Sequence, residues 1–275
     1  MLEDKLQHLK TLLSGMDGAV VAYSGGVDSA FLACVAAETL GDRALAVTAR
    51  SPSYPAVELA QAAALARERG LRHRLIDTGE VTRSEYAANG PDRCYFCKQT
   101  LFATLEPIAR EEGLSQILLG AIAEDLQDYR PGHKAALEAG ARAPLAEAGL
   151  TKAEVRELSR RMGLPTWDKP ASACLASRVR YGLPIDAKVL GIIEAAEGFL
   201  LGLGFRELRV RHDGPTARLE FPLPDLVRVL DHREAIVTHL KSLGYLYVSL
   251  DLEGFRSGSG NLLLGRGATP GTPGR

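Results

Sequence analysis

Short apolar strands alternate with helical segments along the first half of the chain, and this alternation constrains the fold more than any other feature. The strands are predicted over residues 18–23, 43–49, 73–77 and 116–120, and the helices over 1–16, 29–41, 55–69 and 97–112. This spacing is typical of a parallel sheet covered by helices on both faces. The predicted fold class is therefore α/β, with a nucleotide expected at the carboxyl ends of the strands.

The pattern changes in the second half. A helix is predicted over 151–162, where Thr151 and Glu154 form a capping box, and a proline-containing loop follows over 163–185. A helix over 186–203, a hairpin at Asp213-Gly214, a helical stretch over 223–243 and a strand over 245–250 then indicate a smaller α+β domain. We divide the chain into a nucleotide domain (1–170), a substrate and sulfur-transfer domain (171–262) and a tail predicted to be disordered (263–275).

Composition limits the partners. The chain of 275 residues has 33 Lys and Arg against 34 Asp and Glu, a net charge of -1. This balance gives no reason to expect nucleic acid. No apolar run approaches the length that spans a bilayer, and the charged N-terminus lacks the apolar core of a signal peptide. We expect a cytoplasmic protein that binds neither membrane nor nucleic acid.

The stretch Ser24-Gly25-Gly26-Val27-Asp28-Ser29 lies between the first strand and its helix. Glycines there allow close approach of a phosphate to backbone N–H groups, and the helix dipole adds positive potential. Ser24 and Ser29 can donate hydroxyl hydrogen bonds, and Asp28 can hold Mg²⁺ or orient the loop. The spacing matches neither G-x-x-x-x-G-K-[ST] nor G-x-G-x-x-G, which excludes two common nucleotide loops.

This loop resembles the signature of the PP-loop ATP pyrophosphatase superfamily, which has an adenine nucleotide α-hydrolase-like fold. Together with "RCYFCK" (93–98), "GAIAEDLQDYRPG" (120–132), "GLPTWDKPASACLASRVRYG" (163–182) and "EGFRSGSGN" (253–261), it resembles the LarE family of sulfur transferases over residues 5–262. The resemblance implies that ATP and Mg²⁺ activate a carboxylate of pyridinium-3,5-biscarboxylic acid mononucleotide. Sulfur then displaces AMP and gives a thiocarboxylate, on the route to the nickel-pincer nucleotide cofactor of lactate racemase.

Three of the four cysteines, Cys94, Cys97 and Cys174, bear on the source of sulfur. One branch of the family sacrifices the sulfur of a single cysteine, matched here by Cys174. The two further cysteines resemble the other branch, in which three thiolates hold a [4Fe–4S] cluster and leave one iron for an extra sulfide. The alternatives for Cys94 and Cys97 are structural Zn²⁺ or a redox disulfide. Cys174 can instead be packed, and Cys34 is expected in the core.

Further site residues follow from strand ends and from the resemblance. The predicted ATP contacts beyond the loop are Ala49, Arg50, Ser51, Lys98, Gly120 and Asp125. The predicted contacts with the substrate phosphate are Ser177, Arg178, Arg209, Arg211 and His212, because paired guanidinium groups suit a phosphate. Glu197 and Glu220 are candidate ligands of a metal or of the substrate in the same region, with surface charge as the alternative.

Three other functions compete with this interpretation. The first is tRNA thiolation, whose enzymes also use three cysteines but need a basic RNA-binding surface. The second is amide synthesis with ammonia, which leaves the cysteines unexplained. The third is a nucleotide-binding regulatory module without turnover. For the favoured function we expect a homo-oligomer and a nickel-insertion partner downstream.

Overall fold

The computed structural model describes residues 1–126, 131–170, 173–256 and 258–265. These residues divide into two compact units. The N-terminal unit comprises Met1–Glu80 and Asp92–Ser172, and the C-terminal unit comprises Val81–Pro91 and Ala173–Arg275. Residues 266–275, which fall in the tail predicted to be disordered, lie outside the described residues.

The described part of the N-terminal unit contains a four-stranded parallel sheet in the order β3-β2-β1-β4. Its strands are β1 (Ala19–Ala22), β2 (Ala44–Arg50), β3 (His73–Asp77) and β4 (Gln116–Leu119). Its helices are α1 (Leu2–Ser14), α2 (Val27–Leu40), α3 (Ala56–Glu68), α5 (Arg93–Glu111), α6 (Pro131–Glu138), α7 (Pro144–Glu147) and α8 (Lys152–Arg161). Its 3₁₀ turns are η1 (Gly41–Arg43), η2 (Glu80–Thr82) and η3 (Ala123–Leu126), and η2 continues into the other unit. This arrangement confirms the predicted α/β class.

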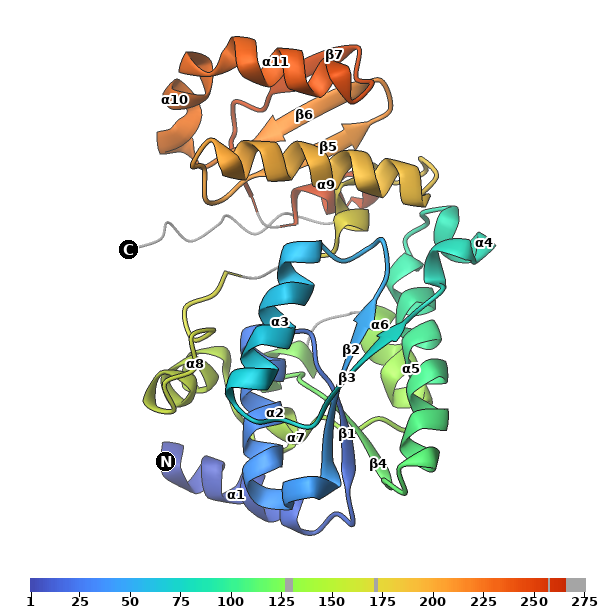
Figure 1. Ribbon diagram of the computed structural model, residues 1–275, viewed down its shortest axis with the longest axis vertical. Helices are drawn as coiled ribbons and strands as arrows, with labels where there is room; N and C mark the ends of the chain where they lie inside the picture. Colours follow the sequence, from blue (N-terminus) through green and yellow to red (C-terminus); the bar gives the residue numbers. More distant parts are fainter. Residues whose placement is uncertain (127–130, 171–172, 257, 266–275) are drawn as a thin grey trace. The chain divides into compact units, whose positions relative to one another are not determined.

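Both faces of the parallel sheet are buried. Val20 pairs in register with Leu45 and faces a core supplied largely by α5. The next residue, Val21, faces the opposite core, to which α1, α2, α3 and α8 contribute. Figure 1 shows α5 and α6 on one side of this sheet and α2 and α3 on the other. Side chains alternate along a strand, so the apolar run of β1 serves two cores at once.

The C-terminal unit holds a three-stranded sheet in the order β5-β6-β7 among its described residues. The strands are β5 (Arg209–Asp213), β6 (Thr216–Glu220) and β7 (Tyr247–Leu250); the helices are α4 (Ser84–Ala87), α9 (Ala187–Gly202), α10 (Leu226–Asp231) and α11 (Arg233–Ser242), with η4 (Leu175–Arg178), η5 (Leu223–Asp225) and η6 (Ser259–Leu264) as 3₁₀ turns. The β5–β6 pair forms the expected hairpin, while β7 runs parallel to β6.

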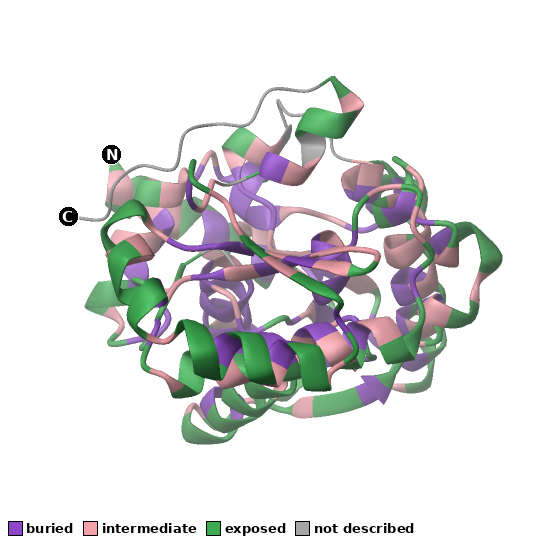
Figure 2. Cartoon of the chain, turned by 90° about the horizontal axis from the view of Figure 1, so that it is seen from above, coloured by how far each residue is buried: buried purple, intermediate pink, exposed green. Residues whose placement is uncertain are grey.

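A separate apolar core stabilises the C-terminal unit. It joins α9, α11 and the small sheet through residues such as Leu200, Phe221 and Leu240. Figure 2 shows buried and exposed residues alternating along the helices as purple and green bands. In α9 the buried positions Leu190, Ile193, Ala196, Glu197 and Leu200 recur at helical spacing, so one face of the helix meets the core.

The segment Val81–Pro91 lies in the C-terminal unit, although the sequence interpretation assigned it to the first domain. Asn89 is buried and has a φ of +54°. Its side-chain amide donates hydrogen bonds to the carbonyl groups of Arg180 (2.8 Å) and Leu183 (2.9 Å). These bonds connect residues far apart in sequence, which explains why the sequence pattern did not place the segment.

Candidate functional site

Residues 24–29 comprise part of the turn that follows β1 and the first three residues of α2, at the carboxyl edge of the parallel sheet. Gly25 has a φ of +72°, in the left-handed region that favours glycine. A Cβ atom at this position would lie 2.6 Å from the Cβ of Ala62 in α3. The loop therefore requires glycine at residue 25 for two reasons, its backbone angle and its close packing on α3.

Ser29 organises the loop. Its Oγ accepts the backbone N–H of Ser24 at 3.1 Å and lies 3.0 Å from the Ser24 hydroxyl. Gly26 is the N-cap of α2, and the Ser29 hydroxyl reaches its carbonyl at 3.3 Å. The N-terminus of a helix presents backbone N–H groups and positive potential. The loop therefore has the chemistry that binds phosphate oxygens.

Asp28 lies on the first turn of α2, and its two carboxylate oxygens differ. Oδ2 accepts a hydrogen bond from Nζ of Lys152 at 2.6 Å. Oδ1 is buried and has no hydrogen-bond partner among the described residues. A buried carboxylate oxygen without a partner suits a cation ligand, so the geometry fits the prediction that Asp28 holds Mg²⁺.

Two lysines that sequence reasoning missed lie beside the loop. Lys152 is the first residue of α8 and contacts Asp28, as described above. Lys169 donates to the carbonyl oxygen of Gly25 at 3.4 Å and pairs with Glu58 of α3. In sequence each lysine reads as ordinary surface charge. The available sequence signal for Lys152 was its position, because it directly follows the recognisable N-cap Thr151. The N-terminal turns of helices gather at this edge of the sheet, so a lysine there can reach the loop.

The other predicted ATP contacts follow the strands that flank β1. Ala49 and Arg50 end β2, and Ser51 follows; Arg50 pairs with Asp77 at 2.6 Å, and this hydrogen bond raises the pKa of the Arg50 guanidinium. The Ser51 hydroxyl donates to the buried Glu80 carboxylate. Ala49 is partly buried and lies against the α5 core.

Gly120 follows β4 and packs against α2, since a Cβ at this position would lie 2.9 Å from the backbone nitrogen of Ser29. This glycine therefore lets the end of β4 approach the loop closely. Asp125 lies in η3, where one carboxylate oxygen accepts the backbone N–H of Ile122 at 3.2 Å. Residues 127–130 of the same predicted motif lie outside the described residues.

Cys94 and Cys97 both lie in the first turn and a half of α5. The sequence prediction began this helix at residue 97; the structure begins it at Arg93 and so places the two cysteines one turn apart. Cys94 is exposed, and Cys97 is half-buried with its Sγ 3.8 Å from the Tyr54 hydroxyl. Lys98 follows on the same helix and packs its stem against Gly132.

Cys174 is the N-cap of η4 in the C-terminal unit. Its carbonyl oxygen accepts hydrogen bonds from the Ser177 hydroxyl (2.8 Å) and from the Arg178 guanidinium (2.9 Å). The backbone that carries this thiol is thus fixed by two of the predicted phosphate-binding residues. Residues 171–172, which precede it, lie outside the described residues.

The described residues do not bring together enough metal-ligating side chains to complete a metal site. Within the described residues, no group of three His, Cys, Asp or Glu side chains is arranged to hold one metal ion. Cys94 and Cys97 place two thiol groups on one helix, and cysteine thiolates are the usual protein ligands of iron–sulfur clusters. The donor chemistry of this pair therefore fits two of the three expected cluster ligands, and Cys174 belongs to the other unit.

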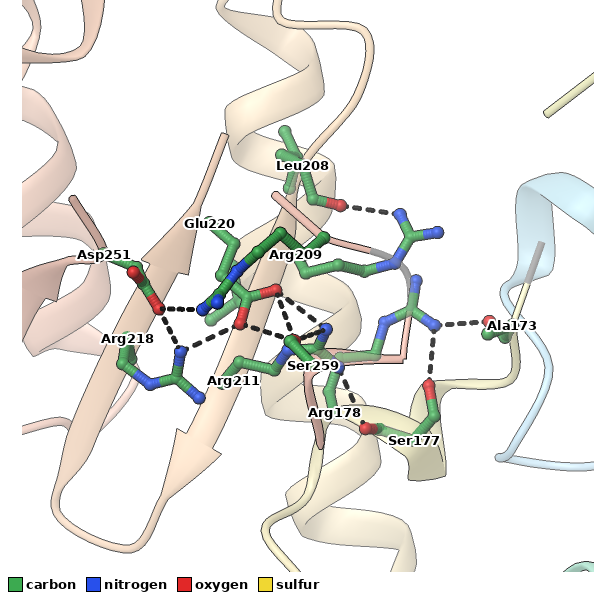
Figure 3. Close-up of polar contacts among 12 residues, drawn as sticks. Ala173, Ser177, Arg178, Leu208, Arg209, Arg211, Arg218, Glu220, Asp251 and Ser259 are labelled. Carbon is green, nitrogen blue, oxygen red and sulfur yellow. Dashed lines mark hydrogen bonds and ion pairs between the residues drawn. The ribbon is translucent and has the colours of Figure 1, made fainter. Parts of the chain in front are cut away.

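The C-terminal unit gathers arginines and carboxylates into one cluster; Figure 3 shows Arg211 and Arg218 of this cluster with Glu220 and Asp251. Arg178 is buried and pairs with Glu197 through two parallel hydrogen bonds, from Nε at 3.0 Å and from Nη2 at 3.1 Å. Arg211 pairs with the fully buried Glu220 at 2.7 Å and also donates to the carbonyl oxygen of Ser177 at 3.1 Å. Both candidate glutamates are thus neutralised by arginines within this cluster.

Arg209 differs from its neighbours. Its guanidinium donates to the carbonyl oxygen of Leu208 at 2.7 Å, lies 5.0 Å from the centre of the Phe255 ring, and makes no ion pair with any described residue. Burial, and then the nearby charge of Arg178, lowers the pKa of Arg209 to about 10. A cation held in partly buried surroundings without a carboxylate is well suited to an incoming anion.

The remaining predicted residue, His212, lies on β5 with its Nδ1 3.1 Å from the Tyr245 hydroxyl. Burial lowers its pKa. Sequence reasoning missed Arg218, Asp251 and Ser259, which complete the cluster: Arg218 pairs with Asp251 at 2.6 Å, and the Ser259 hydroxyl donates to Glu220 at 3.0 Å. Arg218 and Asp251 come from different segments and left no local signal, and Ser259 lies in the stretch 253–261, in which the resemblance did not single it out.

None of the helices in the described residues combines the length and the apolar character needed to cross a membrane.

A parallel sheet with a serine–glycine loop at the carboxyl edge of its first strand defines the PP-loop class of ATP-utilising enzymes. The family model described as NAD synthase, which belongs to this class, matches residues 2–105. An NH(3)-dependent NAD(+) synthetase of Mannheimia succiniciproducens is 30% identical over 181 residues, covering 62% of this chain and 71% of that protein.

Two relatives match almost the whole chain. An uncharacterised protein of Synechocystis is 45% identical over 267 residues, covering 96% of this chain and 99% of the relative. The pyridinium-3,5-bisthiocarboxylic acid mononucleotide synthase of Lactiplantibacillus plantarum is 37% identical over 261 residues, covering 94% of this chain and 95% of the synthase. The chain belongs to the LarE family, of which this synthase is a member. It is therefore a PP-loop ATP-dependent sulfurtransferase.

Proposed function

We propose that this enzyme adenylates a carboxylate of pyridinium-3,5-biscarboxylic acid mononucleotide and replaces the AMP with sulfur, giving a thiocarboxylate. The name of the Lactiplantibacillus relative supports the substrate. The observation that carries the proposal is the position of Cys174, whose carbonyl oxygen is bound by Ser177 and Arg178 within the arginine cluster. The backbone of a cysteine is thus held by side chains that suit the phosphate of a mononucleotide.

The phosphate loop supplies the first half of the reaction. The N–H groups at the start of α2 and the hydroxyls of Ser24 and Ser29 bind the ATP phosphates, and Asp28 holds Mg²⁺. An oxygen of the substrate carboxylate attacks the α-phosphorus, the bond from that phosphorus to pyrophosphate breaks, and the leaving group carries away the electron pair. Fixed donors at the phosphates stabilise the charge that develops during this step.

The arginines hold the substrate in the second half. Arg209 is the cation that remains without an ion pair to any described residue, and Arg211 retains a buried Nε without a partner among them. Both belong to β5, with Val210 between them, so the two side chains project from the same face of the strand. We assign the phosphate of the mononucleotide to this pair, supported by Ser177, Arg178 and His212.

Cys94, Cys97 and Cys174 are the proposed ligands of a [4Fe–4S] cluster. Such a cluster, when bound through three thiolates, has one iron without a protein ligand and supplies sulfide from it. The support from this chain is the pairing of Cys94 and Cys97 on one helix turn and the fixed backbone at Cys174. A homo-oligomer and a nickel-inserting partner remain predictions that follow from the family.

Release of pyrophosphate tests the function. Mixing the protein with Mg²⁺–ATP should release pyrophosphate only when pyridinium-3,5-biscarboxylic acid mononucleotide is present. Arg209→Gln should raise the KM for the mononucleotide by about 10-fold, the effect of losing one charge-assisted hydrogen bond, and leave the affinity for ATP unchanged. Arg233→Gln is the control, because Arg233 is exposed on α11 and pairs only with its neighbour Glu234 among the described residues. Pyrophosphate release with tRNA instead of the mononucleotide would contradict the proposal.

A further inference from the structure

The guanidinium group of Arg209 lies over an aromatic ring. Its central carbon is 5.0 Å from the centre of the Phe255 ring, and both side chains are half-buried. The face of an aromatic ring carries negative potential, which attracts a cation, and a planar guanidinium group can stack on it. The ring of Phe255 therefore restricts the positions that this guanidinium group can take.

Arg209 keeps its donors free because the carboxylate of the same cluster serves other groups. Oε1 of Glu197 accepts from Arg178 and from the Val210 backbone N–H, both at 3.0 Å, and Oε2 accepts from Arg178 at 3.1 Å. Nη1 of Arg209 donates to the carbonyl oxygen of Leu208 at 2.7 Å (Figure 3). Its Nε and Nη2, which form one edge of the guanidinium group, have no hydrogen-bond partner in the part of the chain that the structure describes. The ring thus takes the place that a carboxylate occupies beside other buried arginines.

The turn after β7 fixes the backbone of Phe255. Gly254 has a φ of +72°, and its N–H donates to the carbonyl oxygen of Asp251 at 3.1 Å. A Cβ atom at Gly254 would lie 2.8 Å from the carbonyl oxygen of Phe221. The same oxygen accepts the backbone N–H of Phe255 at 2.8 Å. The ring therefore belongs to a backbone that is held at the end of β6 independently of Arg209.

We propose that Phe255 is a positioning residue for the phosphate of the mononucleotide: its ring holds the Arg209 guanidinium group so that the edge with Nε and Nη2 meets the phosphate. A ring over one face leaves the donors in the plane of the group, where they can bind two phosphate oxygens at once. A carboxylate in the same place would occupy those donors and cancel the charge. This inference rests on the proposed function, in which Arg209 binds this phosphate.

NMR relaxation of the Arg209 Nε–H group tests the positioning without any substrate. In the wild type this group should be ordered, with an order parameter of about 0.85, and in Phe255→Leu the value should fall below about 0.6. Phe255→Tyr keeps the ring and should keep the order. Equal order parameters in the wild type and Phe255→Leu would show that the ring does not hold the guanidinium group, and the proposal would be wrong.

Steady-state kinetics with the mononucleotide show whether this position matters for binding. Phe255→Leu should raise KM by about 5-fold, the value of one cation–π contact, and leave kcat unchanged. Phe255→Tyr should stay within about 2-fold of the wild-type KM. An unchanged KM in Phe255→Leu would overturn the proposal. Absence of pyrophosphate release by the wild type would instead count against the proposed function, while the relaxation measurement still tests the contact between ring and guanidinium group.

A double variant shows whether Phe255 acts through Arg209. Arg209→Gln lacks the guanidinium group, so adding Phe255→Leu should raise KM no further than the about 10-fold effect of Arg209→Gln alone. A multiplied increase of about 50-fold would show that Phe255 acts on the substrate without Arg209 and would contradict its assignment as a positioning residue.

Phe199→Leu is the matched control for loss of an aromatic side chain. Phe199 is also half-buried in the C-terminal unit, and its ring stacks on that of His239 with the centroids 4.0 Å apart. It follows Glu197 by two positions on α9, so the two side chains point about 200° apart around the helix. Phe199→Leu should lower the melting temperature, as Phe255→Leu does, and leave KM and the order of Arg209 at their wild-type values. An equal rise of KM in both variants would show that lost packing causes the effect and would overturn the proposal.

Discussion

Gly25 is the residue whose substitution tests the phosphate loop most simply. Gly25→Ala must place a side chain at a φ of +72° and 2.6 Å from the Cβ of Ala62. We expect it to destabilise the N-terminal unit by about 2 kcal/mol and to abolish ATP binding. Gly113→Ala is the control: its φ is +65° but a Cβ there meets nothing within 4 Å. It should cost about 1 kcal/mol and leave ATP affinity unchanged. Equal effects of the two substitutions on ATP binding would contradict this account.

His73 gives the N-terminal unit a defined response to acid. Thr48 donates its hydroxyl to the Tyr23 carbonyl oxygen at 2.8 Å, so its oxygen accepts from Nε2 of His73, also at 2.8 Å. This assigns the proton of the neutral ring to Nε2. Burial lowers the pKa of His73 below its usual 6.5. The unfolded chain therefore takes up a proton first as the pH falls, and the stability that His73 contributes above 6.5 is lost below it.

Chemical denaturation at about pH 7.5 and about pH 5.5 measures this contribution. The wild type should lose more free energy of unfolding between these values than His73→Gln, whose side chain does not titrate. His8→Gln, exposed on α1, should behave like the wild type. An identical loss in wild type and His73→Gln would show that other groups account for the acid response.

The residues of the loop illustrate what a sequence can reveal at this scale. Ser24, Gly25, Asp28 and Ser29 were recognisable because the strand, turn and helix that hold them are contiguous. Lys152 was not, because its contact with Asp28 spans 124 positions. A lysine in a first helical turn is also expected to be solvated, so nothing in its local pattern distinguished it from surface charge.

At the scale of elements, α8 connects the loop to the segment that leads toward Cys174. Lys152 contacts Asp28, and one turn further on Arg156 donates to the carbonyl oxygens of Trp167 (2.6 Å) and Lys169 (2.8 Å). Lys169 itself reaches Gly25. The position of α8 therefore affects both lysines that contact the phosphate loop, Lys152 directly and Lys169 through Arg156.

The capping box of α8 therefore has a testable functional effect. Thr151 Oγ1 accepts the Glu154 backbone N–H, so Thr151→Ala removes a cap and should destabilise the unit by about 1 kcal/mol. Because Lys152 is the next residue, the affinity for Mg²⁺–ATP should fall as well. Thr11→Ala on the exposed face of α1 should change neither quantity, by thermal melting and calorimetry. Unaltered ATP affinity in Thr151→Ala would show that the helix end does not position Lys152.

Element boundaries show where sequence patterns stop being informative. The capping box and the β5–β6 hairpin were predicted from local signals and are confirmed. The start of α5 was misplaced by four residues, because Pro91 and the Cys-x-x-Cys spacing are typical of a loop. The helical stretch 223–243 is divided at His232 into α10 and α11.

At the scale of the whole molecule, each unit has its own core, and Asn89 tests whether the inserted segment stabilises the C-terminal unit. Asn89→Ala removes the amide donor from the Leu183 carbonyl and leaves the Arg180 carbonyl with the Leu183 N–H (3.0 Å) alone, which should cost about 2 kcal/mol. Hydrogen exchange should then accelerate in β5 and β6, while β1 and β2 keep their protection. Faster exchange in all four strands would contradict two independent cores.

The fold class was predictable for the molecule as a whole because alternating strands and helices leave few topologies. The arginine cluster was only partly predictable. Arg209 and Arg211 share a strand, which their spacing indicates, but the partners of the clustered arginines come from three other segments. Glu197 pairs with Arg178, Glu220 pairs with Arg211, and the Ser259 hydroxyl accepts a hydrogen bond from Arg211. Such pairings arise from packing between elements and have no signature in a single stretch of sequence.

The number of thiocarboxylates formed per protein chain tests the central claim most directly. After anaerobic iron–sulfur reconstitution, the protein is mixed with sulfide, Mg²⁺–ATP and pyridinium-3,5-biscarboxylic acid mononucleotide, and the products are counted by mass spectrometry. We predict more than two thiocarboxylates per chain, with Cys174 intact, and none in Cys94→Ala. At most one per chain, accompanied by a loss of H₂S mass at Cys174, would contradict the cluster mechanism, and no thiolated product at all would contradict the proposed function.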